Sequence, residues 1–228
     1  MIVDAIHSWS LDYRRAAALQ DQLKERIVLF GSGEGIRLVA GADVSYEKWG
    51  DLFYAAVVVM DIETFEVIDS AHHVSRVGFP YIPGLLSFRE GPIVLSAFEK
   101  LSTVPQAAIF DGQGIAHPRR FGLAAHMGLL LGIPSAGCAK TRLVGEHGEV
   151  KSERGSSAPL IHNNETVGYV VRTKEETRPV FVSPGNLISC EGAVGLVLSA
   201  TGRYRIPEPI RAAHILVNRL RKEKKSRQ

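Results

Sequence analysis

The chain has 228 residues, enough for a sizeable core, and its 45% hydrophobic and 22% charged residues are typical of a globular protein. The net charge of +3 permits a nucleic-acid partner without demanding one. The two cysteines, Cys138 and Cys190, match neither zinc nor redox spacing, which argues against a disulfide scaffold or a thiolate metal site and favours a reducing cytoplasm.

No composition break, repeat or long linker divides the chain, so we expect one domain over residues 1–228. The amino-terminal residues lack a basic segment followed by an apolar one, so no signal peptide is expected. No apolar run has the length of a membrane span, so we expect a cytoplasmic protein without a membrane partner. The basic residues 220–228 are predicted to form a frayed, solvated tail with weak attraction to phosphate.

The first periodic segment lies between residues 10 and 27, where the apolar spacing predicts an amphipathic helix that begins near Ser10 or Asp12. Residues 31–35 then carry three glycines. This segment lacks the Lys-Ser/Thr ending of a phosphate-binding loop and does not lead from a strand into a helix. We therefore interpret it as a flexible connector.

Three apolar segments follow, and their spacing predicts an antiparallel meander over residues 37–46, 52–60 and 65–75. Asp43 lies inside the first predicted strand. A charged side chain there must be paired, bind a cation or face a cleft, because burying an uncompensated carboxylate costs too much free energy.

Residues 79–90 are stiff and extended, because two prolines flank Tyr81 and Ile82. One interpretation is a proline-rich loop packed on the core. The functional alternative is a wedge that enters a stacked substrate. Glu90 is predicted at the start of a helix over residues 91–101, where a carboxylate is favourable against the helix dipole.

The segment 107–110 is a short apolar run that predicts a strand buried on both faces, and it ends at Asp111. Gly112-Gln113-Gly114 favours a tight turn or the close approach of a ligand. A helical pattern begins near residue 121. Open α/β sheets place their ligands at such strand ends. The alternative is an ordinary strand–loop–helix unit whose aspartate caps a turn.

A strand of small residues is predicted over 135–142, and Lys140 near its end could meet a phosphate or be a plain surface lysine. On the last predicted helix, His214 lies on a mostly apolar face, which by itself favours a structural role. The remaining predicted elements are a hairpin of strands at 160–162 and 167–172, a strand at 179–182, a turn at 183–186, and helices near 191–200 and 207–222.

Three carboxylates from these elements, Asp43, Glu90 and Asp111, could meet at one edge of the sheet. Hard oxygen ligands of this kind bind magnesium or manganese. Such a cation lowers the pKa of an attacking water and neutralises charge on a phosphodiester. No Gly-x-Ser-x-Gly nucleophile motif is present to compete with this hypothesis.

Four segments, residues 41–46, 80–90, 111–122 and 138–141, together resemble the endonuclease V family, the deoxyinosine-directed nucleases of nucleic-acid repair. The Pro-Tyr-Ile-Pro-Gly and Asp-Gly-x-Gly-x-x-His-Pro-Arg runs within them are very specific, and the order of elements matches along nearly the whole chain. The resemblance implies a ribonuclease H-like α/β fold, in which a mixed central β-sheet is flanked by helices on both faces.

The resemblance also implies an activity, which is the hydrolysis of the second phosphodiester bond on the 3′ side of inosine or deoxyinosine in DNA. The reaction would depend on magnesium, and manganese would substitute for it. The products would be 3′-hydroxyl and 5′-phosphate ends, formed during DNA repair. Three alternatives stay open. They are an inosine-specific endoribonuclease that acts mainly on RNA, a non-cleaving binder of deaminated nucleic acid, and a ribonuclease H-like nuclease that cuts by structure.

By the same resemblance, Asp43, Glu90 and Asp111 form the metal centre, and His214 joins them directly or through water. Lys140 contacts phosphate near the cut, and Tyr81 is the strand-separating wedge. The residues that the resemblance implies for the wedge and the base pocket, as lining or support, are Pro80, Tyr81, Ile82, Pro83, Gly84, Leu85, Gly112, Gln113, Gly114, Ile115, His117 and Gly122.

Overall fold

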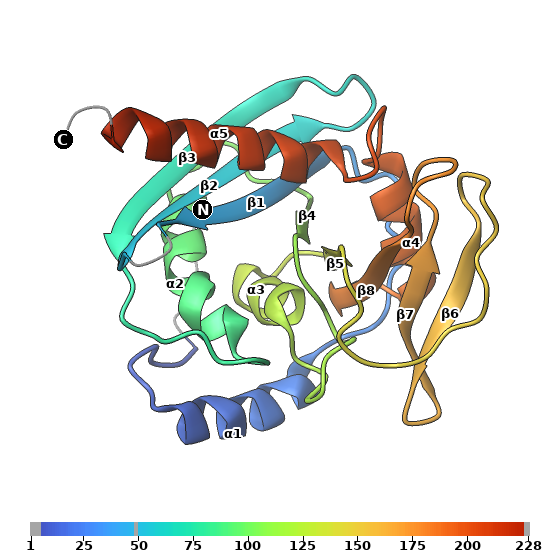
Figure 1. Cartoon of the computed structure of the whole chain (residues 1–228), viewed down its shortest axis with the longest axis horizontal. Helices are drawn as coiled ribbons and strands as arrows, with labels where there is room; N and C mark the ends of the chain where they lie inside the picture. Colours follow the sequence, from blue (N-terminus) through green and yellow to red (C-terminus); the bar gives the residue numbers. More distant parts are fainter. Residues whose placement is uncertain (1–5, 48–49, 226–228) are drawn as a thin grey trace.

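The computed structural model describes residues 6–47 and 50–225, and its centre is a mixed sheet with the strand order β3-β2-β1-β4-β5-β8-β7-β6 (Figure 1). The strands β1, β4 and β5 run parallel to one another, and the other neighbouring pairs are antiparallel. The strands are β1 (Leu38–Tyr46), β2 (Leu52–Asp61), β3 (Val67–Arg76), β4 (Ala107–Phe110), β5 (Ser135–Ala139), β6 (Ser157–His162), β7 (Glu165–Val171) and β8 (Val180–Asn186).

Helices cover both faces of this sheet, which confirms the predicted fold class. On one face lie α2 and α3, with α1 packed beyond them, and on the other face lie α4 and α5. The helices are α1 (Tyr13–Leu23), the short 3-10 helix η1 (Lys24–Arg26), α2 (Leu86–Phe98), α3 (Leu123–Leu131), α4 (Cys190–Ser199) and α5 (Glu208–Lys225). No helix within the described residues is long and apolar enough to cross a membrane.

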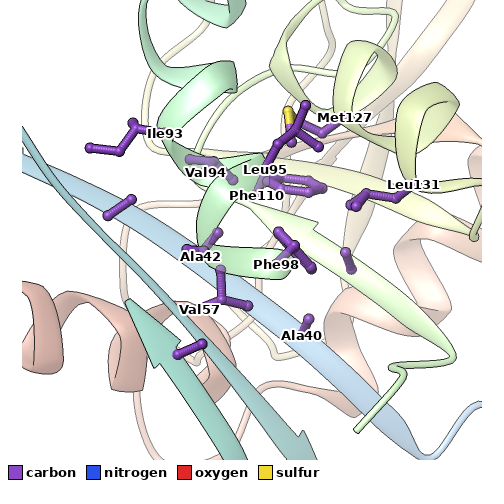
Figure 2. Packing of buried hydrophobic residues seen from close by; sticks show 14 of the residues in the cluster. Ala40, Ala42, Val57, Ile93, Val94, Leu95, Phe98, Phe110, Met127 and Leu131 are labelled. Atoms are coloured by element: carbon purple, nitrogen blue, oxygen red, sulfur yellow. The ribbon is translucent and has the colours of Figure 1, made fainter. Parts of the chain in front are cut away.

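The larger core cluster fills the space between α2, α3 and the sheet. Figure 2 shows Ala42 and Val57 of the strands facing Phe98 of α2, with Met127 of α3 nearby. β2 is buried along nearly its whole length because α2 covers one of its faces and α5 covers the other. A strand covered on both faces needs apolar residues on both, which explains its unbroken run of them.

Two local predictions are confirmed in detail. Asp12 caps α1, since its side chain accepts a hydrogen bond from the backbone N–H of Arg15 at 2.9 Å. The hairpin of β6 and β7 turns at Asn163 and Asn164, which both adopt positive φ angles, 51° and 61°. Asparagine tolerates this conformation, and a turn of this kind matches the twist of a hairpin.

The helix α2 begins at Leu86 and not at residue 91, so the prediction that Glu90 starts a helix is wrong. Glu90 lies in the second turn, and Pro92 lies inside the helix. A proline within a helix forfeits one backbone hydrogen bond. Here the buried face of α2, which includes Phe88 and Ile93, packs on the core and offsets that loss.

The strand β8 continues through Ser183–Asn186, so the turn predicted there is wrong. Its backbone is held by partners remote in sequence. The N–H of Ile115 donates to the Pro184 carbonyl at 2.9 Å, and the N–H of Asn186 donates to Ser135 Oγ at 2.9 Å. The pairing with β5 shifts register at Ser135, and such irregularities accommodate a proline in a sheet.

The helix α5 continues to Lys225, beyond the predicted end at residue 222. Residues 220–225, predicted as part of a frayed tail, are therefore helical, and residues 226–228 lie outside the described residues.

Candidate active site

Asp43 and Asp111 lie next to each other on two parallel strands, Asp43 within β1 and Asp111 directly after the last residue of β4. β1 and β4 pair in parallel up to Ala42 and Phe110, and each aspartate is the next residue of its strand's path. Neighbouring strands are about 4.8 Å apart, so this register holds the two carboxylates within reach of one another. The Asp111 carboxylate accordingly contributes to raising the pKa of Asp43, although burial is the main cause of that rise.

Glu90 reaches the same place from α2. Burial, together with the neighbouring carboxylates of Asp43 and Asp111, raises the pKa of Glu90 to about 8, against the opposing effect of the Arg89 guanidinium. Like charges influence each other in this way only at short range within a poorly solvated site. The structure therefore gathers the three acidic side chains in one neighbourhood.

Two cationic or polar partners face these acids. His214 Nδ1 lies 2.7 Å from Asp43 Oδ2, and the Asn218 side chain donates to the His214 backbone carbonyl at 2.8 Å. The Lys140 ammonium is paired with the Asp111 carboxylate. His214 is exposed and not buried in the core, so the apolar surroundings that the sequence pattern favoured for it are wrong.

Within the described residues, no three His, Cys, Asp or Glu side chains are already arranged around one point as metal ligands. Oxygens of Asp43 and Asp111 instead face His214 and Lys140. The donor set nevertheless fits a hard divalent cation, since three carboxylates supply oxygen ligands. Burial and then the repulsion between the carboxylates raise the pKa of Glu90, and a cation between them would remove that repulsion.

A pocket of about 450 Å³ adjoins the acid cluster through Asp111 and Lys140. Asp43, Glu90 and His214 lie outside its lining. Eight of the predicted base-pocket and wedge residues line it, namely Tyr81, Ile82, Pro83, Gly84, Gly112, Gln113, His117 and Gly122.

Four other predicted residues are not part of this lining. Leu85 is buried against Phe88, and Ile115 is buried in the cluster around Leu160. Gly114 lies so close to β8 that an added Cβ would overlap the carbonyl of Pro184. Pro80 lines a separate, shallow groove beside α1. Leu85, Gly114 and Ile115 thus support the wall of the pocket from behind.

The carbonyl oxygen of Gly84 fixes the wall of the pocket, because it accepts hydrogen bonds from three side chains. The donors are Gln20 Nε2 at 3.0 Å, His117 Nε2 at 3.0 Å and Arg119 Nη2 at 2.9 Å. Arg119 Nε also donates to Gln20 Oε1 at 2.6 Å. Burial lowers the pKa of His117 to about 4, so its ring is neutral near pH 7. The result is a rigid link between α1, the proline-rich segment and residues 117–119.

Sequence reasoning missed Gln20, Ser87 and the segment 141–143 as lining residues. Gln20 was detectable, since it interrupts the apolar stripe of α1 between Ala16 and Leu23, and a polar residue on a buried stripe needs partners.

We expect Gly84→Ala to destabilise the protein. Gly84 has a φ of +80°, and an added Cβ would lie 2.9 Å from Arg119 Nη2. The left-handed backbone alone costs a side-chain-bearing residue about 1–2 kcal/mol. Thermal unfolding measures the loss, and Gly78→Ala is the control, because a Cβ at Gly78 meets no atom within 4 Å. Equal melting temperatures for the two variants would contradict the strain at Gly84.

The sheet order, the helices on both of its faces and the neighbouring acids on β1 and after β4 define a protein of the ribonuclease H-like class. The family model of Endonuclease V matches residues 21–215. The chain belongs to the endonuclease V family, and it is a hydrolase that acts on phosphodiester bonds.

The similarity to single relatives covers nearly the whole chain. An endonuclease V of Myxococcus xanthus is 48% identical over 95% of this chain and 93% of its own length. The crystal structure of the endonuclease V of Streptomyces avermitilis has a TM-score of 0.90 and 42% identity, with 96% of each chain covered. The endonuclease V of Ciona intestinalis has a TM-score of 0.80 and 26% identity, with 95% of this chain and all of that chain covered. That protein was crystallised with a 24mer DNA containing an inosine followed by a ribo-adenosine.

Proposed function

We propose that this nuclease recognises inosine in DNA and hydrolyses the second phosphodiester bond on its 3′ side, with Mg²⁺ or Mn²⁺, for the repair of deaminated adenine. The products would carry 3′-hydroxyl and 5′-phosphate ends. The observation that carries the proposal is the separation of two adjoining sites. The pocket touches the acid cluster only at Asp111 and Lys140, while Asp43, Glu90 and His214 lie outside its lining.

This separation suits an enzyme that cuts at a distance from the base it recognises. A base taken out of the stack needs a slot that reads its edge, and a slot walled by glycines lets the backbone approach closely. The phosphate to be cut then lies elsewhere, beside the carboxylates. The inosine-containing DNA bound by the Ciona intestinalis relative supports the same choice of substrate.

The acid cluster suits the chemistry of phosphodiester hydrolysis. A magnesium ion held by Asp43, Glu90 and Asp111 would supply charge neutralisation and an acidified water. His214 would hold the Asp43 carboxylate in place through their 2.7 Å contact. Lys140 is half exposed, so it can exchange its pairing with Asp111 for an oxygen of an incoming phosphate.

Tyr81 is placed to act as the wedge, since it lines the pocket while 64% of its surface stays exposed. We expect Tyr81→Ala to weaken discrimination between inosine and ordinary bases in duplex DNA by about ten-fold, because a stacked base contributes about 1–3 kcal/mol through an aromatic side chain. Competition binding with the two duplexes measures this ratio. Tyr81→Phe, which keeps the ring, is the control, and unchanged selectivity in Tyr81→Ala would count against the wedge.

The proposed function is tested with an end-labelled duplex that carries one inosine, incubated with magnesium or with excess chelator, and with the product ends mapped. Cleavage only with magnesium, at the second bond on the 3′ side, is the expected result. A matched RNA strand, and a DNA strand with a ribonucleotide after the inosine, are the further substrates. Preferential cleavage of the RNA would favour the endoribonuclease, and binding without cleavage would favour the non-cleaving binder.

A further inference from the structure

A chain of hydrogen bonds leads from the partly exposed His7 to the pocket. His7 Nδ1 lies 2.9 Å from the carbonyl oxygen of Ser8, and His7 Nε2 lies 2.7 Å from His126 Nε2. His126 Nδ1 lies 2.9 Å from Ser87 Oγ. Ser87 lines the pocket, and His126 does not. The acid cluster takes no part in this chain of contacts.

The chemistry of the partners fixes the direction of every hydrogen in this chain. A carbonyl oxygen only accepts, so His7 Nδ1 carries the hydrogen, and the Nε2 of a neutral His7 is an acceptor. His126 Nε2 must then donate to it, which leaves His126 Nδ1 as an acceptor. The Ser87 hydroxyl therefore donates its only hydrogen to His126, and its free lone pairs accept.

Both rings are held in the neutral state that this direction requires. Burial lowers the pKa of His7 and places that of His126 well below its ordinary value. His126 is fully buried, and the rings of Trp9, Phe88 and Phe121 surround it. Ser87 itself is only 1% exposed, so its hydroxyl has little access to bulk water.

A second acceptor lines the same pocket. Gln113 Nε2 donates to the Thr141 carbonyl at 3.1 Å, which orients the amide. Its Oε1 is buried and has no hydrogen-bond partner within the described residues, although the side chain lines the pocket. Gln113 as a whole is 8% exposed. A buried acceptor without a partner costs free energy until a donor arrives.

We infer that Ser87 is a specificity-determining residue, whose Oγ accepts a hydrogen bond, together with Gln113 Oε1, from a ring N–H of the bound base. His126 and His7 are positioning residues, because their hydrogen bonds keep the Ser87 oxygen an acceptor. The inference rests on the proposed function. Hypoxanthine carries a hydrogen on N1, whereas N1 of adenine is itself an acceptor. Two acceptors that face each other repel, so the pocket rejects the undamaged base at the atom that deamination changes.

The first test measures how binding depends on the hydrogen at N1 of the base. The affinities of wild type and of Ser87→Ala are compared for two DNA strands, one with inosine and one with unsubstituted purine, whose N1 bears no hydrogen. Ser87→Ala should weaken binding of the inosine strand by about ten-fold, the worth of one hydrogen bond, and leave the purine strand unchanged. Ser87→Thr, which keeps the hydroxyl, should preserve the wild-type ratio. An equal loss on both strands would overturn the role of Ser87.

The second test locates the hydrogens on the ring nitrogens of His126 and His7, and it needs no substrate. Nitrogen-15 NMR of the full chain should show His126 protonated at Nε2 and bare at Nδ1, and His7 protonated at Nδ1. A hydrogen on His126 Nδ1 would make Ser87 Oγ a donor toward the pocket and would overturn the inference. Should wild type fail to nick or bind inosine strands while the NMR result holds, the proposed function fails and the hydrogen-bond chain stands.

The variant His7→Ala tests whether the two histidines orient the Ser87 hydroxyl or only fill space beside it. It removes the acceptor for His126 Nε2 without touching the pocket, and His7 is only half-buried. A fall in the preference for inosine over purine, smaller than that of Ser87→Ala, is the expected result, with a lower melting temperature because the buried His126 Nε2 loses its acceptor. An unchanged preference would show that the two histidines do not position the hydroxyl, and would overturn that part of the inference.

Discussion

Asp43→Asn is expected to lower the rate of nicking of an inosine-containing strand by more than about a hundred-fold, since loss of even an outer partner of a metal ligand costs about 10–100-fold. The substitution keeps the shape of the side chain and removes one of the three neighbouring carboxylates. His214 Nδ1 lies 2.7 Å from Asp43 Oδ2, and in the variant this contact would be made to a neutral amide. Binding of the inosine strand should persist, because Asp43 lies outside the lining of the pocket.

Single-turnover nicking and gel-shift binding, measured on the same preparations, separate these two effects. Asp51→Asn is the matched control, because its ion pair with Arg76 is exposed and neither residue lines the pocket or contacts Asp43. It should nick like wild type. Activity of Asp43→Asn within a few-fold of wild type would remove the acid cluster from the mechanism.

Gly41→Ala is expected to lower the melting temperature by roughly 6–12 °C. The first turn of α5 packs directly on the backbone of β1 here, and an added Cβ would overlap the carbonyl group of Pro209 and the amide nitrogen of Ile210. Overpacking of a tight contact costs about 1–3 kcal/mol, and this contact involves backbone on both sides, so we expect the upper end. In a domain of this size each kcal/mol shifts the melting temperature by about 2–4 °C.

The same substitution should also slow nicking, because displacing α5 moves His214 away from Asp43. Gly195→Ala is the matched control. Gly195 lies in the exposed middle of α4, where a Cβ meets no atom within 4 Å, and alanine is the better helix former there. A Gly41→Ala protein that melts and nicks like Gly195→Ala would show that β1 and α5 tolerate a wider spacing.

The local sequence pattern was sufficient to predict the elements whose interaction partners are close in sequence. The meander of β1, β2 and β3, the cap at Asp12 and the hairpin turn at Asn163 each follow from a few neighbouring residues. The errors lie where tertiary contacts override local preference. Pro92 favours a helix start, but the core needs the face of α2 that begins earlier. The Ser-Pro-Gly-Asn run favours a turn, but backbone and side-chain partners from β5 and the 114–115 segment hold it as strand.

For the site, the residues alone identified the acids and suggested that they could meet at one edge of the sheet, but not how they would be brought there. The gathering of Asp43, Glu90 and Asp111 depends on strand register and on the reach of α2, neither of which has a local signature. The resemblance to a known family implied that this group forms a metal centre, and the structure places the three side chains in one neighbourhood. Their roles as ligands stay a prediction. The hydrogen bonds to the Gly84 carbonyl and the contact of Ser87 with His126 could not be predicted, because they join segments that are distant in sequence.

Because α5 supplies His214 while the acids come from β1, α2 and β4, the order of assembly during synthesis is set by the chain itself. A ribosome completes the acidic residues first and delivers the histidine-bearing helix last. A half-made polypeptide would therefore hold the three acids without His214, and the contact between His214 and Asp43 would form last.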